Sequence, residues 1–216
     1  MAQKSAGLTE TYLASLFAGK GVLVTGGSSG IGLACAQAFR DLAAEVVATG
    51  ATATECKAAS VDPANHGIAF TSVDVREGGQ IDALVDSFGR LDVLVNSAGI
   101  IRRDDEHDPD IFAEVLSVNL TGTMRVCAAA RQKLADTSGC VINMASMLTY
   151  FGGPRVPAYA ASKGGIGQLT KSLAAAWAID NVRVNAVAPG WIATALTQAL
   201  RDNPTASAPI LGRTPM

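Results

Sequence analysis

The chain has 216 residues, of which 49% are hydrophobic and only 5% aromatic, and it contains 22 glycines. This length suits one domain, and the apolar fraction suffices for a sizeable core. The formal net charge is −2, so bulk electrostatics favours neither nucleic acid nor an anionic membrane surface as a partner.

The N-terminal segment, residues 1–18, is expected to be an extension that precedes the folded domain. Polar residues interrupt every apolar run there, so no signal peptide is predicted, and no stretch of the chain approaches membrane-spanning length. The four cysteines show no C-x-x-C spacing, and two histidines are too few for a His-based metal site. These features predict a reduced, cytoplasmic protein that binds no metal. Five apolar side chains of the segment could share one helix face: Leu8, Tyr12, Leu13, Leu16 and Phe17.

Six short apolar runs alternate with helix-length segments along the rest of the chain. The runs are continuously apolar, as in strands that are covered on both faces. They span residues 21–25, 45–50, 67–74, 91–96, 140–146 and 182–189. Long helices are expected over about 110–135 and about 158–178. The order predicts one domain, residues 19–216, with an α/β fold: a single doubly wound, Rossmann-type parallel sheet flanked by helices on both faces.

The first strand leads directly into TGGSSGIG, residues 25–32, and then into a helix. Gly26, Gly30 and Gly32 permit a tight turn and a close approach of the backbone to a ligand. The N-terminus of the following helix offers unpaired N–H groups to a phosphate. The spacing differs from the commoner G-x-G-x-x-G fingerprint, and such a loop can be merely a tight turn. A strand before it and a helix after it favour dinucleotide binding.

The residues after the second strand bear on which dinucleotide is bound. An acid there accepts hydrogen bonds from an adenosine 2′-hydroxyl, whereas a basic residue pairs with a 2′-phosphate. The chain has uncharged TGAT at 49–52, and Ser29 in the glycine loop is also uncharged. Because no arginine is in place to hold a phosphate, NAD is favoured, with NADP as the alternative. Asp74, after the third strand, is a candidate acceptor for the adenine amino group, or a simple helix-capping acid.

Polar motifs stand where the later strands end. The fourth strand ends in NSAG at 96–99, the fifth in MAS at 144–146 and the sixth in APG at 188–190. Ligands of an open parallel sheet lie outside the carboxyl ends of its strands, so these motifs are expected beside the glycine loop. Tyr159 and Lys163 lie one helical turn apart and share a helix face. Such a pair on its own is more often a half-buried ring and a solvated charge.

Together these motifs resemble those of the short-chain dehydrogenase/reductase family. TGGSSGIG, NSAG, NLTG at 119–122, Ser146, YAASK at 159–163 and APG occur in that family's order and positions, from about residue 19 to 216. The resemblance implies a catalytic tetrad of Asn119, Ser146, Tyr159 and Lys163. It also implies hydride transfer between a nicotinamide cofactor and a secondary alcohol or ketone, in a homodimer or homotetramer that acts on a small molecule.

The resemblance further assigns cofactor contacts to the glycine loop, to the ends of the later strands and to the helix pair. The residues are Gly26, Ser28, Ser29, Gly30, Ile31, Gly32, Asp74, Val75, Asn96, Ala98, Gly99, Tyr159, Lys163, Pro189, Gly190, Ile192 and Thr194.

The chemistry of the tetrad explains the tyrosine–lysine spacing. A phenol, with a pKa of ~10, is a poor proton acceptor near neutrality. The Lys163 ammonium and the positive nicotinamide ring would both stabilise the phenolate and lower that pKa. Tyr159 would then take the proton of the substrate hydroxyl, with Ser146 hydrogen-bonded to the same oxygen. Lys163 would also bind the nicotinamide ribose, and Asn119 would position a water that relays the proton.

Substrate specificity is expected from the loops 99–108, 147–157 and 190–202. These loops resemble one branch of the family, the 2-dehydro-3-deoxy-D-gluconate 5-dehydrogenases and neighbouring gluconate dehydrogenases. A sugar acid needs a cation for its carboxylate, which arginine binds bidentately. The candidates are Arg102, Arg103 and Arg155, with Trp191 as a wall of the nicotinamide pocket. The alternative is that Arg103 pairs with Asp104 or Asp105 on the surface. Residues 193–211 are expected to form a mobile lid.

Two other functions fit the sequence. One is an NADPH-dependent carbonyl reductase, for example of 3-oxoacyl thioesters, because the uncharged TGAT could accommodate a phosphate. The other is a nucleotide-binding regulator or scaffold without catalysis, against which the complete tetrad argues. The chain stops at LGRTPM, where family members continue. Either this sequence is incomplete, or the protein lacks the usual C-terminal helix and final strand, which take part in subunit contacts.

Overall fold

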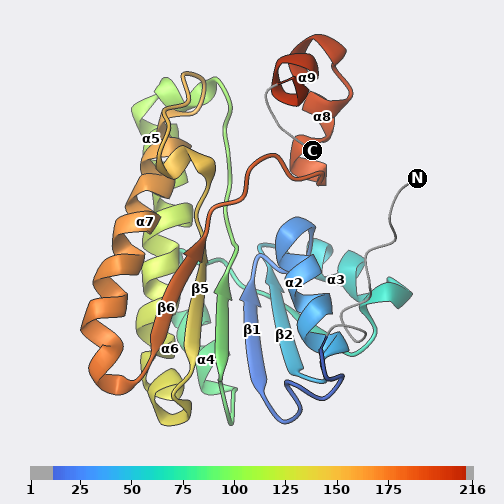
Figure 1. Ribbon diagram of the computed structural model, residues 1–216, viewed down its shortest axis with the longest axis vertical. Helices are drawn as coiled ribbons and strands as arrows, with labels where there is room; N and C mark the ends of the chain where they lie inside the picture. Colours follow the sequence, from blue (N-terminus) through green and yellow to red (C-terminus); the bar gives the residue numbers. More distant parts are fainter. Residues whose placement is uncertain (1–11, 213–216) are drawn as a thin grey trace.

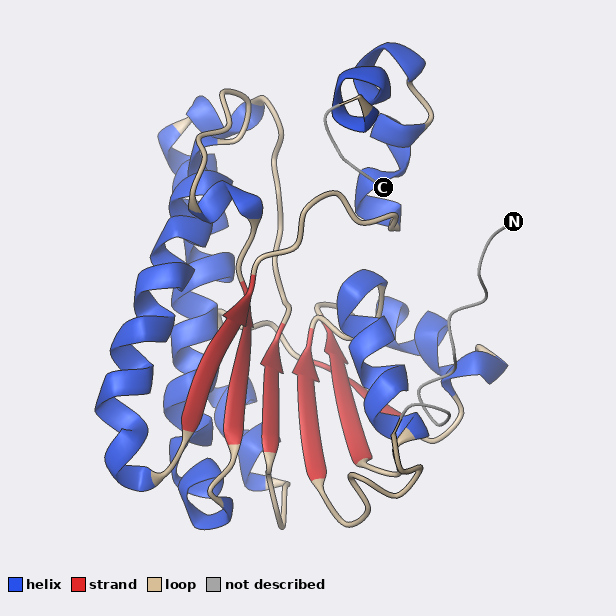
Figure 2. Cartoon of the chain, in the orientation of Figure 1, coloured by secondary structure: helices blue, strands red, loops and turns tan. Residues whose placement is uncertain are grey.

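A computed structural model describes residues 12–212 of the chain. Its six strands form one sheet in the order β3-β2-β1-β4-β5-β6, with every neighbouring pair parallel (Figure 2). They are β1 (Gly21–Thr25), β2 (Glu45–Gly50), β3 (Ile68–Ser72), β4 (Val93–Asn96), β5 (Cys140–Met144) and β6 (Arg183–Val187). The strand order reverses between β1 and β4, so the sheet is doubly wound and the predicted fold class is confirmed.

Helices cover both faces of the sheet (Figure 1). On one face lie α2 (Gly30–Asp41) and α3 (Ala53–Ser60). On the other lie α4 (Gly78–Asp86), α5 (Pro109–Leu116), α6 (Thr123–Thr137) and α7 (Pro157–Trp177). The short helices α8 (Gln198–Arg201) and α9 (Pro204–Leu211) lie beyond the carboxyl ends of the strands, where the lid was expected. Within residues 12–212, no helix is long and apolar enough to cross a membrane.

The sheet interior explains why the strand runs are continuously apolar. Successive side chains of a strand point to opposite faces. In β1, Leu23 joins the core beneath α4, α6 and α7, whereas Val22 and Val24 join the core beneath α2. All three are fully buried. Each such side chain contributes roughly 1.5–3 kcal/mol by burial, so both faces stabilise the sheet and neither tolerates alternating polar residues.

The segment before β1 differs from the sequence expectation. Residues 12–19 form turns and not a helix, so the expected helix face is wrong over the described part of the segment, and Leu8 lies outside it. Tyr12, Leu13 and Leu16 are exposed. Phe17 alone packs on the domain, with its ring edge-on to Phe39 at a centroid distance of 5.0 Å.

The long helix expected over 110–135 is interrupted at its centre. A π-helical turn at 117–122 separates α5 from α6. There the Thr123 hydroxyl donates a 2.8 Å hydrogen bond to the Asn119 carbonyl. A Cβ atom placed on Gly122 would lie 2.6 Å from Cγ2 of Val75, so glycine lets the turn press against the loop after β3. Such a turn re-aims one side chain, in this case Asn119, toward the carboxyl end of the sheet.

Candidate active site

The glycine loop needs glycine for two separate reasons. Gly26 and Gly30 have φ angles of +62° and +57°, in the left-handed region that other residues adopt only under strain. A Cβ atom placed on Gly26 would also lie 2.6 Å from Cα of Ala98. The loop is therefore in direct backbone contact with the end of β4. The Thr25 hydroxyl supports this contact by accepting the Ala98 N–H at 3.3 Å.

The N-terminus of α2 is open toward this loop. In the described structure, Ser29 occupies the cap position but its side chain makes no capping hydrogen bond, and both Ser29 and Gly30 are exposed. Ser28 holds the loop to β2 through a 3.2 Å bond from its N–H to the Thr49 carbonyl. Thr194 of the loop after β6 lies close by, with its methyl group 3.7 Å from a Cβ atom placed on Gly30. Open N–H groups at a helix N-terminus between two loops fit a phosphate.

The end of β2 carries a carboxylate that the sequence interpretation missed. Glu55 accepts the Ala51 N–H at 2.9 Å, while the Thr52 hydroxyl accepts the Glu55 N–H at 3.2 Å. Thr52 thus caps α3 in a threonine-x-x-glutamate pattern, TATE at 52–55, although the Glu55 side chain accepts the N–H of the residue before the cap and not that of the cap itself. The sequence signal was present, and it places a negative charge beside the last residues of β2.

Asp74 lies two residues beyond β3 and is not free. Arg76 donates to it through Nε at 3.0 Å, and this hydrogen bond holds the pKa of the Asp74 carboxyl below its ordinary value. The neighbouring Val75 is buried against Gly122. Asp74 thus stands at the sheet edge where an adenine ring was predicted, with its carboxylate already paired.

Lys163 and Tyr159 are brought together on the first turns of α7. The Lys163 ammonium lies 5.5 Å from the centre of the Tyr159 ring and donates a 2.6 Å hydrogen bond to the Met144 carbonyl at the end of β5. Lys163 is only 5% exposed, and burial lowers its pKa to about 8. Ser146, two residues after β5, is buried as well and lies near enough to the phenol of Tyr159 to lower its pKa.

The protein's own groups raise the pKa of Tyr159. Burial is the largest cause, the hydrogen bond with Ser146 acts in the opposite direction, and the negative charge of Glu106 raises the pKa further. The expected lowering by Lys163 is therefore wrong for the polypeptide by itself. Burial penalises the phenolate, and the same burial disfavours the charged form of the lysine that was expected to stabilise it.

Asn119 joins the group from the π-helical turn. Its Oδ1 accepts the Ile100 N–H at 2.8 Å, and its Nδ2 donates to the Ile100 carbonyl at 2.9 Å. Ser162 on α7 accepts from the same amide at 3.1 Å. A Cβ atom placed on Gly99 would lie 3.3 Å from Asn119 Oδ1 and 3.9 Å from Lys163 Nζ, so the end of β4 lies between the two side chains. Through these contacts the structure clusters the four expected tetrad residues.

Asn96 points away from this cluster. Its Nδ2 donates to Asn143 Oδ1 at 2.9 Å and to Cys127 Sγ at 3.2 Å, within the core beneath α6 and α7. Its Oδ1 is buried and has no hydrogen-bond partner among the described residues. Only the main chain of Asn96 therefore faces the glycine loop.

The loop after β6 completes the rim of the site. Pro189 accepts the Met147 N–H at 3.2 Å, which joins this loop to the end of β5. The next residues, Gly190, Trp191 and Ile192, are all solvent-exposed or nearly so. The structure thus places the predicted cofactor residues of this loop along the same edge as the tetrad.

Two of the three candidate substrate arginines form ion pairs, and the third does not. Arg102 pairs with Glu114 on α5 at 3.2 Å, and Arg155 pairs with Asp104. Arg103 makes no ion pair within residues 12–212, with Asp104 or Asp105 or any other acid, although its charge is one of the causes that lower the pKa of Asp104. Asp104 instead binds an arginine 51 positions away.

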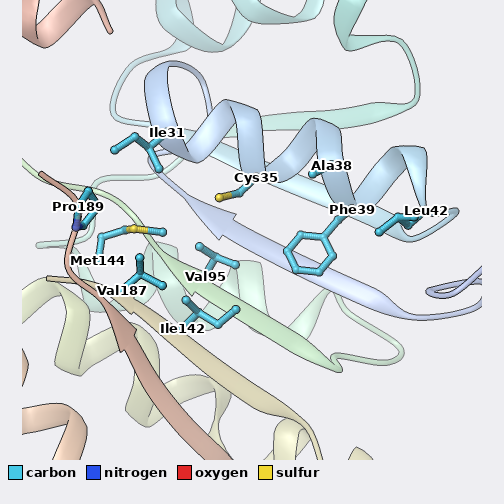
Figure 3. Close-up of a pocket in the computed structure, with 10 residues that line it drawn as sticks. All are labelled: Ile31, Cys35, Ala38, Phe39, Leu42, Val95, Ile142, Met144, Val187 and Pro189. Carbon is cyan, nitrogen blue, oxygen red and sulfur yellow. The ribbon is translucent and has the colours of Figure 1, made fainter. Parts of the chain in front are cut away.

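An apolar groove of about 360 Å³ lies on the α2 face of the sheet (Figure 3). It includes two predicted cofactor residues, Ile31 and Pro189, but none of the tetrad. Burial raises the pKa of its one thiol, Cys35, which makes that thiol less reactive. The groove therefore lies beside the candidate site without sharing its chemistry. Its lining is Ile31, Cys35, Ala38, Phe39, Leu42, Val95, Ile142, Met144, Val187 and Pro189.

Comparison with known proteins gives consistent results. The family model for short chain dehydrogenases matches residues 20–205. A 2-dehydro-3-deoxy-D-gluconate 5-dehydrogenase of Escherichia coli K12 is 37% identical over 205 residues, covering 91% of this chain and 81% of that protein. A 3-oxoacyl-acyl-carrier-protein reductase of Chlamydia pneumoniae is 38% identical over 194 residues, covering 86% and 78%. The crystal structure of a gluconate 5-dehydrogenase from Burkholderia cenocepacia J2315, with NADP and tartrate, superposes with a TM-score of 0.84 at 31% identity, covering 93% and 82%.

Proposed function

Because the chain belongs to the short-chain dehydrogenase family, and is therefore an NAD(P)-dependent oxidoreductase, we propose that it interconverts a secondary alcohol and a ketone of a sugar acid or polyol. The observation that carries this proposal is the cluster of Ser146, Tyr159, Lys163 and Asn119 at the carboxyl ends of β4 and β5. Loops there join the glycine loop, as expected of a site that binds substrate and dinucleotide together.

The residues present fit a dinucleotide. The glycine loop has two left-handed glycines and an open helix N-terminus, which suit a pyrophosphate. Gly99 leaves space beside Lys163 and Asn119, where a Cβ atom would otherwise project. When bound, the nicotinamide supplies the hydride chemistry. Contacts to it are assigned to Ala98, Gly99, Pro189, Gly190, Ile192 and Thr194, with Asp74 and Val75 toward the adenine.

Tyr159 is the proposed proton-transfer group. In the oxidative direction, its oxygen takes the proton as the O–H bond of the substrate breaks and the C=O bond forms. Ser146 lies near the phenol and lowers its pKa, and it would hold the same substrate oxygen. Lys163, with a pKa of about 8, exchanges a proton near neutrality and would pass it outward. Asn119 fixes the end of β4 through Ile100 and would hold the relay water.

We favour NAD over NADP because of Glu55. Its carboxylate is held at the end of β2 by the Ala51 N–H, where an adenosine ribose is expected. A carboxylate there accepts hydrogen bonds from a 2′-hydroxyl and repels a 2′-phosphate. The Burkholderia structure, in contrast, contains NADP.

An acidic substrate is favoured by Arg103 and by the relatives. Of the three candidate arginines, Arg103 is the one without an ion pair in the described structure, so it can bind a carboxylate without breaking such a pair. The Escherichia coli relative is named for a sugar acid, and the Burkholderia structure contains the dicarboxylate tartrate. Arg102 and Arg155 would first have to release Glu114 and Asp104.

The second candidate is a reductase of 3-oxoacyl thioesters. The Chlamydia relative carries that name at 38% identity. Tyr150 and Phe151 are both exposed on the loop after β5, where an acyl chain could lie against them. This function predicts a preference for an apolar ketone and does not use Arg103.

We also propose a cytoplasmic homodimer or homotetramer. The four cysteines, Cys35, Cys56, Cys127 and Cys140, are all free, which supports a reducing compartment. Light scattering during size-exclusion chromatography would measure the assembly.

A substrate panel tests the proposal. Sugar acids, uncharged polyols of matched length and 3-oxoacyl thioesters are each incubated with NAD or NADP in the appropriate redox state, and reduced nicotinamide is followed by absorbance. We expect the highest kcat/KM for a sugar acid with NAD. Equal or greater kcat/KM for the polyols or thioesters would overturn the acidic-substrate assignment. A preference for NADP would overturn the cofactor assignment alone.

A further inference from the structure

Glu106 is a buried carboxylate that the proposed mechanism does not use. It lies in a single 3₁₀ turn at 105–107, within the loop that follows β4, and is 1% exposed. Its Oε2 accepts the main-chain N–H of Tyr159 at 2.7 Å, and its Oε1 accepts the main-chain N–H of Arg102 at 2.9 Å. No cation pairs with it among the described residues. Burying a charge that only backbone donors hold costs free energy, and this cost indicates a role for Glu106.

The bond to Tyr159 supplies a cap that α7 otherwise lacks. The helix begins at Pro157, and the preceding Val156 has no side-chain acceptor for its first N–H groups. Glu106 provides that acceptor from another part of the chain, at the third residue of the helix. A carboxylate at a helix N-terminus is further stabilised by the helix dipole.

The same loop is joined to the segment before α7 by three other contacts. The Asp104 N–H donates to the Arg155 carbonyl at 2.8 Å, and Arg155 Nε donates to the Asp104 carboxylate at 2.6 Å. The His107 ring lies 3.0 Å from the Pro154 carbonyl. These three contacts are exposed, so Glu106 is the buried member of the set, and the one that reaches Tyr159 itself.

We propose that Glu106 is a positioning residue for Tyr159, because its buried carboxylate ties the Arg102 loop to the first turn of α7 and thereby fixes the phenol relative to Ser146. The proposal rests on the function proposed above, since it assumes that the phenol exchanges the substrate proton. It adds a residue that touches neither substrate nor cofactor, and it couples the substrate loop to the proton-transfer group.

The charge of Glu106 has a second consequence, for protonation. Its negative charge is one of the causes that raise the pKa of Tyr159. Other charged or titratable groups on the elements packed against the phenol are few. Lys163 lies on α7 itself, while Asp105 and His107 are exposed on the 3₁₀ turn. On α5, Asp110 is exposed and Glu114 is paired with Arg102. Glu106 is therefore the buried carboxylate near the phenol.

Two variants separate position from charge. Glu106→Gln removes the charge and leaves one carbonyl oxygen for two N–H donors. Glu106→Asp keeps the charge on a shorter side chain. Asp92→Asn is the matched control, because Asp92 is also a buried carboxylate that accepts a main-chain N–H, from Gly21 at 3.0 Å, but it lies at the opposite end of the sheet.

For Glu106→Gln we expect kcat/KM for the substrate to fall about tenfold to a hundredfold, as for a small misplacement of a reacting group, with the Kd for NAD unchanged. The acid limb of the kcat profile in the oxidative direction should move to lower pH, because the charge that raises the pKa of Tyr159 is gone. Glu106→Asp should lower kcat without moving the limb. Asp92→Asn should lower Tm and change neither quantity. A Glu106→Gln enzyme with kcat/KM within twofold of the wild type and an unmoved limb would overturn the proposal.

NMR of protein labelled with ¹³C at the tyrosine ring carbon that bears the hydroxyl gives a readout that needs no turnover. The chain has three tyrosines, and Tyr159→Phe assigns the signal. Glu106→Gln, or Glu106→Asp if the first variant does not fold, should shift that signal, and Glu106→Gln should move its titration to lower pH. An unchanged signal refutes the role of Glu106. An inactive wild type with the expected shift refutes only the proposed function.

Discussion

The ammonium of Lys163 lies 5.5 Å from the centre of the Tyr159 ring, in a site where the lysine is buried and the tyrosine is partly buried. Burial lowers the pKa of Lys163 to about 8 and raises the pKa of Tyr159, so each group is biased toward its neutral form. The pair is therefore held ready for proton exchange. A positive charge brought beside the phenol would favour its ionised form.

Removal of the phenol oxygen tests the proton-transfer role directly. Tyr159→Phe should lower kcat by about 10²- to 10⁴-fold, the usual contribution of a positioned acid or base, while NAD still binds. Steady-state kinetics and NAD titration by fluorescence measure the two effects. Tyr150→Phe is the control, because the Tyr150 side chain is 77% exposed and should tolerate the change. Retention of wild-type kcat in Tyr159→Phe would remove Tyr159 from the mechanism.

Lys163→Met should separate activity from stability. The folded-state pKa of about 8 lies below the ordinary lysine value of ~10.4, so the unfolded chain binds more protons between these limits. The contribution of Lys163 to the free energy of unfolding therefore rises with pH across that window. We expect the variant to lose turnover, and to be most stable relative to the wild type at pH 8 or below.

Urea unfolding at pH 7 and pH 10 measures this difference. Lys171→Met on the exposed side of the same helix is the control, for which the difference should stay flat. A stability difference for Lys163→Met that does not change with pH contradicts the assigned burial effect.

Two glycine variants should distinguish a glycine that the fold of the loop requires from one that ligand binding requires. Gly26→Ala combines a left-handed backbone with a Cβ atom 2.6 Å from Cα of Ala98, so it should destabilise the protein by several kcal/mol, about 3 or more. Gly30→Ala has the same backbone strain, but the nearest atom is 3.7 Å away, so the loss should be about 1–2 kcal/mol.

Thermal unfolding and NAD binding should be compared in these variants. We expect Gly30→Ala to reduce the binding free energy of NAD by more than it reduces the free energy of unfolding. The added methyl group would project from the exposed glycine loop, where the phosphates are proposed to bind. Gly78→Ala, with nothing within 4 Å, is the control. Unchanged affinity in a folded Gly30→Ala protein would place the phosphates elsewhere.

Cofactor preference should depend on Glu55. Glu55→Gln removes the negative charge at the end of β2, so the ratio of the Kd for NADP to the Kd for NAD should fall, by about tenfold if the charge acts on a 2′-phosphate. Calorimetry with each dinucleotide measures it. Glu77→Gln, at the start of α4, is a charge-matched control that should leave the ratio unchanged. Equal ratios in the wild type and Glu55→Gln would show that Glu55 does not determine the preference for NAD over NADP.

Substrate charge should be recognised by Arg103. Arg103→Gln should raise KM for a sugar acid about tenfold or more and leave KM for an uncharged polyol unchanged, because one charge-assisted contact is lost. Arg125→Gln on α6 removes a charge outside the proposed substrate loops and serves as the control. Parallel losses for both substrates would indicate damage to the site and not loss of carboxylate recognition.

Several features of the site followed from local sequence. The glycine loop and the spacing of Tyr159 and Lys163 depend on neighbouring residues and lie where they were expected, whereas β3, β5 and β6 each end two residues earlier than expected. Glu55 could also have been found, because its capping pattern is local. Glu106 could not, since it is one of five consecutive polar residues at 104–108 and no periodicity marks it as buried.

The sequence by itself determined the parallel doubly wound sheet and the edge at which the polar motifs meet, because apolar periodicity and backbone freedom are properties of short segments. The tertiary structure alone decided which charges are free and which are paired. Asp104 forms its ion pair with Arg155, 51 positions away, and not with the neighbouring Arg103. It also decided the direction of the Tyr159 pKa, since desolvation depends on everything packed around a group and not on the neighbour one helical turn away.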